Sequence, residues 1–314
     1  MEQEGSFHLL KAIAKMKTIL FGNGLNYLSE DFITWKQLLD KIKGDNLFEN
    51  GQLPNTMIYE RSIIGNPISF DTLTQKEEAI KIEIAEMLEN FPSNPYYEKL
   101  SKIRAENCLT TNYDYAFLKH FQETTGFKIV NKSTEGIYSV RRYKEVLTNG
   151  KVSHRVWHIH GEIDSPPSIM LGLDHYCGSV AKISSYVKGG YEFQLDKKPQ
   201  KPRAIIDKLR LKEFDGTSWI ELLFNSDVHI IGLGLDFSEI DLWWILNKRA
   251  RFKLDNQTNN LVKNTIFFYS TEEKRDQLDL LKSLQIEIVE IKMDDSKEKY
   301  HKAYDKILKL IDNQ

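Results

Sequence analysis

The sequence predicts an α/β fold: a Rossmann-like, doubly wound parallel sheet with an inserted helical subdomain. Two observations predict it. Short apolar runs alternate with helical stretches, and from residue 227 onward the order is strand, helix, strand, helix, strand, helix. In addition, polar or glycine-bearing segments follow several of the apolar runs, as expected where parallel strands end beside a ligand crevice.

The composition is that of a globular protein and argues against several partners. The chain has 314 residues, enough for one large domain or two smaller ones. A formal net charge of −2 gives no overall attraction to nucleic acid or to an anionic membrane. The acidic start lacks the pattern of a secretory signal, and no apolar run reaches the roughly 18 residues of a membrane span. We therefore expect a cytoplasmic protein.

The first part of the chain is predicted to begin the sheet. Residues 1–15 have the pattern of a short N-terminal helix, and the catalytic domain is expected over residues 16–314. Residues 18–21 form an apolar run that ends at Gly22, as a buried strand would. A helix is predicted at residues 35–42.

Helices then dominate until the second strand. Glycine and proline breakers predict an irregular segment at residues 46–67. Helices are predicted at residues 72–90 and 96–106. Because they precede the second strand, we expect a helical insertion at about residues 45–105.

Strands and helices alternate over the rest of the chain. Asn149-Gly150 between two alternating runs predicts a hairpin. Residues 188–203 have the pattern of a surface loop or small insertion. The expected strands are 108–111, 128–130, 141–147, 152–159, 227–232, 265–269 and 286–291. The expected helices are 115–122, 174–186, 218–225, 238–251, 272–283 and 297–311.

A glycine pair directly follows the first strand. Between Gly22 and Gly24 the backbone has room to approach a pyrophosphate closely, beside the start of the next helix. The dinucleotide fingerprint is incomplete, because Tyr27 stands where its third glycine belongs. An ordinary tight turn is an equal alternative for this segment.

The second strand ends in the segment Thr-Thr-Asn-Tyr-Asp. Asn112 has a donor and an acceptor, so it can hold a sugar hydroxyl and orient a water. The alternative is a turn residue whose side chain is satisfied within the protein. Asp114 is equally suited to cap the helix that starts near Tyr115.

Three histidines lie within or directly after the strand expected at residues 152–159. Strand alternation puts His154, His158 and His160 on one face, which would allow a metal site, although no further ligand is identifiable by spacing. The strand-end position of His160 instead places an imidazole that titrates near neutrality in the crevice. We therefore favour His160 as a catalytic group, with no metal.

The strand at residues 227–232 ends in Gly232-Leu233-Gly234. These glycines would admit the second half of a dinucleotide. The alternative is a plain strand-to-helix turn with Ser238 as the N-cap.

In this order the four segments resemble the sirtuin-like (silent information regulator) superfamily, specifically its bacterial antiphage-defence members. Asn112 and Asp114 match the family's Asn-x-Asp motif, and His160-Gly161 matches its catalytic His-Gly. Gly-Leu-Gly-Leu-Asp-Phe-Ser-Glu-Ile-Asp resembles the segment near the adenosine ribose. The opening glycine loop departs from the family, with Asn23 where sirtuins usually carry alanine and without the downstream Pro-Asp-Phe-Arg segment. The resemblance extends over about residues 18–269.

The resemblance implies that Asn112 and His160 catalyse hydrolysis of NAD to nicotinamide and ADP-ribose, with no metal. Protein-deacetylating sirtuins hold a zinc module with four cysteines, and this chain has two cysteines in total. That module is therefore not expected, and NAD depletion in antiphage defence is the implied activity. The residues expected to bind NAD are Gly22, Asn23, Gly24, Leu25, Asn26, Thr111, Asp114, Gly161, Gly232, Gly234 and Asp241.

Two other functions remain open from the sequence. A non-catalytic module would sense a nucleotide or assemble with a partner protein that carries the toxic activity. A metal-dependent hydrolase would use the three histidines. The expected partners are NAD, further copies of the chain in a homo-oligomer, and a separately encoded defence protein or phage trigger. The sequence does not indicate whether NAD or its phosphorylated form NADP is preferred.

Overall fold

The computed structural model describes residues 16–29, 32–44, 48–65, 72–272 and 274–314. The helix predicted at residues 1–15 lies outside them. The sheet strands are β1 (Lys17–Phe21), β2 (Asn107–Thr110), β3 (Phe127–Asn131), β4 (Tyr143–Thr148), β5 (Lys151–His158), β8 (Asp227–Ile231), β9 (Ile266–Ser270) and β10 (Glu287–Glu290).

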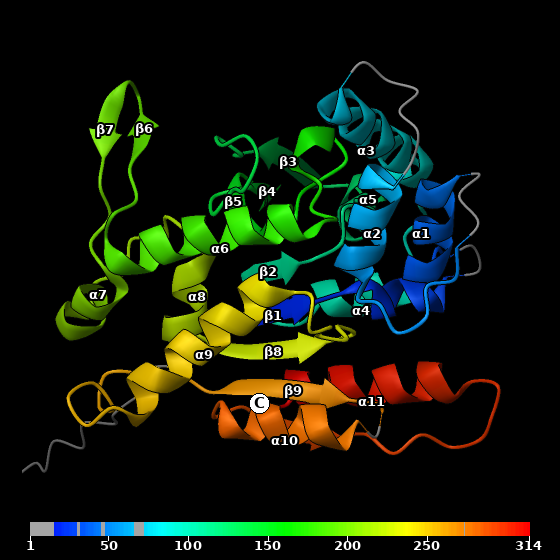
Figure 1. Ribbon diagram of the computed structural model, residues 1–314. Helices are drawn as coiled ribbons and strands as arrows, with labels where there is room; N and C mark the ends of the chain where they lie inside the picture. Colours follow the sequence, from blue (N-terminus) through cyan, green and yellow to red (C-terminus); the bar gives the residue numbers. More distant parts are fainter. Residues whose placement is uncertain (1–15, 30–31, 45–47, 66–71, 273) are drawn as a thin grey trace, which may run out of the picture.

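These strands form one mixed, mostly parallel sheet in the order β10-β9-β8-β1-β2-β5-β4-β3 (Figure 1). The strands from β10 to β5 pair in parallel, whereas β4 is antiparallel to β3 and β5. The chain leaves β1 on one side, towards β2, and returns on the other side at β8. The predicted α/β class with a parallel sheet is confirmed, and β1 and β8 flank the point where the strand order reverses, which favours a ligand crevice.

Helices cover both faces of the sheet, which explains why its central strands are apolar throughout. In β1, Ile19 and Phe21 pack into one buried cluster and Leu20 into the other. Helices α4 (Pro95–Ser101), α5 (Ala116–Glu123) and α11 (Lys299–Asp312) pack in the first cluster. The second cluster includes α6 (Leu173–Lys188), α7 (Ile205–Leu211), α8 (Trp219–Asn225), α9 (Ile240–Leu254) and α10 (Arg275–Ser283).

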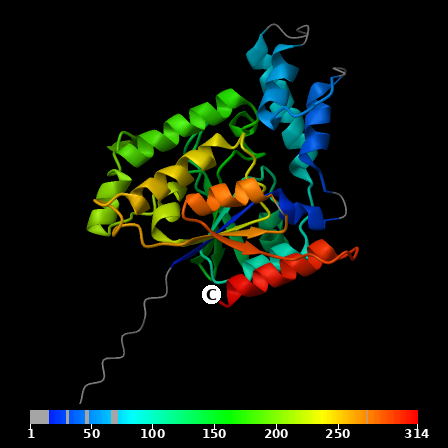
Figure 2. The same ribbon diagram turned by 60° about the horizontal axis from the view of Figure 1, so that its bottom comes forward.

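Between β1 and β2 the chain forms a 3-10 helix, η1 (Asn23–Leu28), and four α-helices. The first three are α1 (Trp35–Lys43), α2 (Asn55–Ile64) and α3 (Leu73–Glu89), and they lie together beside the sheet in both views (Figures 1 and 2). The prediction of an irregular segment at residues 46–67 is wrong for α2. Pro54 and Gly65 are the caps that start and end this helix, so these breakers mark its boundaries.

Three further differences from the sequence prediction are local. Residues 188–203 include a small hairpin, β6 (Phe193–Leu195) with β7 (Lys198–Gln200), and α7 was not predicted. Ser238 is not the N-cap of α9, because Glu239 occupies that position and its side chain makes no capping hydrogen bond. The hairpin at Asn149-Gly150 is confirmed, and both residues have positive φ angles, 51° and 76°.

Candidate active site

A cavity of about 340 Å³ lies at the carboxyl edge of the parallel strands. Segments at the ends of β9, β8, β1, β2 and β5 line it. Helices α1 and α2 also contribute to the lining, with side chains such as Trp35 and Thr56. The predicted site residues found in the lining are Asn23, Gly24, Thr111, Asn112, Asp114, His160, Gly232 and Gly234.

Asn112 is a buried residue of this lining with an unsatisfied amide. Its main chain is fixed, because its N–H donates to Thr110 Oγ1 at 3.0 Å and its carbonyl oxygen lies 3.2 Å from His158 Nδ1. Its side chain is different: Nδ2 is buried and makes no hydrogen bond of good geometry, although it lies close to the Tyr97 hydroxyl, where it opposes the rise that burial causes in the pKa of Tyr97. A buried donor without a well-directed partner is costly, so the Asn112 amide is less fully satisfied than that of a usual turn residue.

The imidazole of His160 lies against the buried carboxylate of Asp241. Its Nε2 lies 3.2 Å from Asp241 Oδ2, and the residues are 2% and 0% exposed. The hydrogen-bond geometry is imperfect, so the contact is best described as an ion pair. Burial lowers the pKa of His160, but the charge and proximity of Asp241 outweigh it and the net pKa is raised. Asp241 also accepts a hydrogen bond from Ser179 Oγ at 2.8 Å.

Asp241 was predicted to bind the nucleotide, but it is not among the residues that line the cavity. Its fully buried carboxylate faces His160 and Ser179 instead. The arrangement suits a positioning role for Asp241, because its carboxylate faces Nε2 of the imidazole and favours a proton on that nitrogen. Sequence reasoning missed this role because no local signal links residues 160 and 241.

Glu239 brings a second carboxyl group to the His160 end of the cavity. Burial raises the pKa of Glu239 to about 7, against the opposing effect of His160 and with help from Asp241 and Asp236. Asp236 and Glu239 both line the cavity. This end of the cavity therefore favours a positively charged group. A carboxyl group whose pKa is near neutrality is typical of functional sites.

The glycine loops after β1 and β8 pack against each other. Gly24 N–H donates to the Gly232 carbonyl oxygen at 2.8 Å. A Cβ added at Gly24 would lie 2.6 Å from Gly232 Cα, and one at Gly22 would lie 2.8 Å from the Gly232 oxygen. The glycines are thus required for loop-to-loop contact. Gly234 differs, because a Cβ there would meet nothing within 4 Å.

Asn26 and Asp114 connect the loop after β1 to the loop after β2. Asn26 Nδ2 donates to Asn23 Oδ1 at 2.8 Å and to Asp114 Oδ2 at 2.9 Å. Asp114 Oδ1 accepts the N–H of Ala116, the first residue of α5, at 2.9 Å. Burial raises the pKa of Asp114, and these hydrogen bonds oppose the rise. Both carboxylate oxygens are engaged within the protein, which supports the capping interpretation of Asp114.

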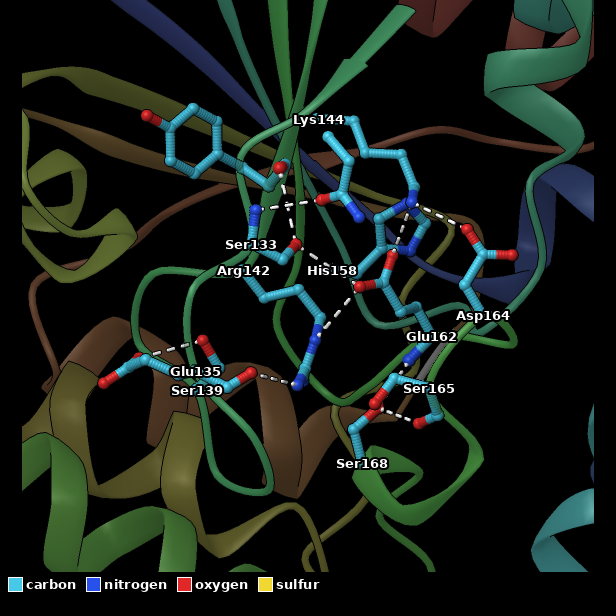
Figure 3. Close-up of polar contacts among 12 residues, drawn as sticks. Ser133, Glu135, Ser139, Arg142, Lys144, His158, Glu162, Asp164, Ser165 and Ser168 are labelled. Carbon is cyan, nitrogen blue, oxygen red and sulfur yellow. Dashed lines mark hydrogen bonds and ion pairs between the residues drawn. The ribbon is translucent and has the colours of Figure 1, made fainter.

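The turn that carries His160 is fixed by a buried charge network (Figure 3). Glu162 lies between Arg142, with its Nε at 3.2 Å, and Lys144, with its Nζ at 3.2 Å. Lys144 also pairs with Asp164 at 2.9 Å. Gly161 has a φ of +106°, and a Cβ there would clash with the backbone of Ser168. Gly161 therefore shapes the turn, and its own atoms do not line the cavity.

The three histidines do not converge. His154 and His158 contact aromatic rings at α5, Phe121 and Tyr115, with centroid distances of 5.0 and 5.2 Å. His160 contacts Tyr176 of α6 instead. His154 and His158 thus share a face of β5, but β5 ends at His158, so the alternation does not extend to His160 and the predicted face common to all three is wrong. No group of three or more potential metal ligands occurs among the described residues.

The remaining predicted residues support the loops. Leu25 is fully buried in the core, and Gly22 and Asn26 hold the loop after β1. Sequence reasoning missed several lining residues because α1, α2 and α11 carry no nucleotide-binding motif. The principal ones are Trp35, Thr56, Tyr300 and Tyr304.

The structure defines the class of protein: α/β, with a mostly parallel sheet and a cavity at the carboxyl ends of its strands. No protein-family model matches the chain, and no curated protein matches it. Among the described residues, no helix is long and apolar enough to cross a membrane.

Proposed function

We propose that the protein is an NAD glycohydrolase that cleaves the bond between nicotinamide and ribose. The observation that carries the proposal is one cavity with an unpartnered Asn112 amide and a His160 imidazole backed by Asp241. The order of the four motifs, which resembles that of sirtuin-like proteins, supports the same activity. The unsatisfied amide favours a ligand-binding role over a purely structural one.

In the proposed reaction, the N–C1′ bond of NAD breaks and its electron pair leaves with neutral nicotinamide. The ribose becomes oxocarbenium-like, and a water attacks C1′. Asn112 holds a ribose hydroxyl or the water, while His160 accepts a proton from it. A positioned base of this kind contributes about 100- to 10,000-fold. Asp241 stabilises the imidazolium that forms.

The charge around His160 suits this substrate. The nicotinamide ring of NAD is cationic, and positive charge develops on the ribose as the bond breaks. Asp236 and Glu239 line the cavity, and Glu239 interacts with His160, so we propose that this segment stabilises both charges instead of binding the adenosine ribose that its resemblance implies. An uncharged or anionic reacting group would gain nothing from these carboxylates.

Purified protein incubated with NAD tests the proposal directly. We expect free nicotinamide and ADP-ribose from the parent and a loss of at least 100-fold in turnover for Asn112→Ala and His160→Ala. Asn247→Ala and His301→Ala, which change exposed residues outside the cavity, are matched controls and should retain activity. Parent-like hydrolysis by either site variant would show that its assigned role is wrong.

Tight NAD binding without any release of nicotinamide would instead favour the alternative, a non-catalytic nucleotide-sensing or assembly module. The proposed biological setting is antiphage defence by NAD depletion in the cytoplasm, and it follows from the family resemblance. On this proposal, residues 45–105 act as a helical insertion of a Rossmann-like domain without a zinc module. Homo-oligomer formation or a separately encoded partner would control the activity.

A further inference from the structure

The cavity continues well beyond Asn112 and His160. In the sheet order, β9 is three strands from β2, a separation of about 14 Å at roughly 4.8 Å per strand. The far end is lined by Tyr27 of η1, Tyr300 of α11, and Glu272 just after β9. An extended dinucleotide with nicotinamide near His160 would therefore place its other half among these residues.

Two tyrosines at the far end present aromatic surface. Tyr27 and Tyr300 are 42% and 40% exposed, although both line the cavity. Burial raises the pKa of Tyr27, and nearby Glu272 and Tyr300 add to the rise, which places the three groups in one cluster. The ring of Tyr27 packs edge-to-face with that of Phe32, with the ring centroids 4.9 Å apart. Exposed aromatic faces beside a cavity are suited to stacking with a nucleobase.

Tyr304 supplies a hydroxyl at the middle of the cavity. The residue is 5% exposed, and a Cβ added at Gly24 or Gly232 would meet its hydroxyl. This hydroxyl makes no hydrogen bond with the described part of the chain. Burial raises the pKa of Tyr304, with Tyr300, Tyr27 and Glu272 adding to it, so the group stays protonated and can donate. It lies where the two glycine loops meet, between the two ends of the cavity.

Few positively charged side chains of the described residues line the cavity and could bind a phosphate. Lys274 is the single lysine or arginine in the described lining, and its Nζ is paired with Glu272 at 2.8 Å. A diphosphate in the middle of the cavity would therefore depend on uncharged donors such as the Tyr304 hydroxyl. Glu272 can accept hydrogen bonds from both ribose hydroxyls, whereas a 2′-phosphate has lost the 2′-hydroxyl that would donate one of them.

We propose that Tyr27, Tyr300, Tyr304 and Glu272 form a subsite for the adenosine diphosphate half of the substrate, and that Glu272 selects NAD over NADP. The proposal rests on the proposed function for the identity of the substrate. Tyr27 and Tyr300 stack on the base, Tyr304 donates to the diphosphate, and Glu272 binds the ribose hydroxyls. The C-terminal helix α11 thereby takes part in substrate recognition.

Calorimetric titration with ADP and with 2′-phospho-ADP tests the subsite without any catalysis. We expect the parent to bind ADP at least tenfold more tightly than 2′-phospho-ADP. Tyr300→Ala should weaken ADP binding about tenfold or more, since it removes a stacking surface. Glu272→Gln should reduce the preference for ADP. Tyr304→Phe, which removes one hydroxyl, should weaken ADP binding more than adenosine binding.

Lys306→Ala on the exposed side of α11 and Glu287→Gln on β10 are matched controls and should bind like the parent. Thermal unfolding of each variant checks that it is folded. Parent-like ADP affinity in folded Tyr300→Ala would overturn the subsite. Equal affinity of the parent for ADP and 2′-phospho-ADP would overturn its selectivity. If the parent binds ADP as expected but releases no nicotinamide from NAD, the subsite stands and the hydrolase proposal fails. If NAD is hydrolysed while the tyrosine variants bind ADP normally, the subsite fails alone.

Discussion

At the scale of single residues, two side chains distinguish the cavity from an ordinary turn region. Most buried polar groups in proteins have hydrogen-bond partners. Asn112 Nδ2 has no well-directed partner, only the nearby Tyr97 hydroxyl, and His160 Nε2 has only an imperfectly directed carboxylate contact. Leaving a buried donor unpaired costs about 1–3 kcal/mol. That cost is offset when a ligand supplies the missing acceptor, which is the physical reason to place a substrate beside Asn112.

Asp241→Asn should move the pH dependence of NAD hydrolysis. His160 must be neutral to accept a proton, so activity falls as pH decreases through its folded-state pKa. Burial lowers that pKa, Asp241 more than compensates, and Glu239 adds a smaller rise; without the Asp241 charge the pKa of His160 should therefore be lower than in the parent. The acidic midpoint of kcat/KM should therefore shift to lower pH in Asp241→Asn, with a reduced maximum rate. The measurement is a pH–rate profile of the variant and the parent.

Asp279→Asn, an exposed position on α10, is the matched control and should leave the profile unchanged. A purely structural role for Asp241 would lower the rate equally at every pH. An unshifted midpoint would thus contradict the assignment of Asp241 as the group that sets the His160 pKa.

At the scale of elements, the site is built from loops that hold one another. The loop after β1 is joined to the loop after β8 through Gly24 and Gly232, and to the loop after β2 through Asn26 and Asp114. The turn after β5 is fixed separately by Glu162 and its cations. Each strand is too short to position these loops alone, so their geometry depends on contacts between them.

Gly24→Ala should destabilise the protein by about 1–3 kcal/mol, the usual cost of overpacking. The added methyl would lie 2.6 Å from Gly232 Cα, so the two loops must separate. Chemical denaturation of variant and parent measures the change in the free energy of unfolding. Gly136→Ala is the matched control, because a Cβ there would meet nothing within 4 Å. Equal stability of Gly24→Ala and the parent would show that the loops adapt without cost.

Element prediction from the sequence worked where the local pattern was decisive. Thr72 caps α3 by accepting from Gln75 N–H, and the helix runs as the apolar pattern predicts. It failed at α2, where Pro54 and Gly65 cap a helix of only ten residues. Proline and glycine break a helix in its interior but favour its ends, and the sequence pattern alone did not distinguish the two cases.

At the scale of the whole molecule, the cavity depends on the strand order. Residues far apart in the chain, such as Asn112, His160 and Tyr300, line one cavity because β1 is central and the chain crosses it between β5 and β8. The lining also includes α1, α2 and α11. A ligand that fills the cavity would therefore contact segments from most of the chain and stabilise the folded state as a whole.

ADP-ribose, the proposed product, should stabilise the protein by about 2.7 kcal/mol when present at 100 times its Kd. The expected observation is a higher midpoint of thermal unfolding that increases with ADP-ribose concentration. Nicotinamide alone contacts one end of the cavity and should stabilise much less at equal concentration. No shift of the midpoint at millimolar ADP-ribose would contradict the proposed dinucleotide site.

The sequence by itself determined the α/β class, the positions of most strands and the strand ends where polar chemistry would gather. Those properties are local: apolar runs, glycine turns and hairpin signals act over a few residues. The pairing of His160 with Asp241, the role of Asp114 in holding loops and the tyrosines of α11 were decided only by the tertiary structure. The physical reason is that these contacts join segments separated by tens to hundreds of residues, and the strand order, which no local pattern specifies, brings them together.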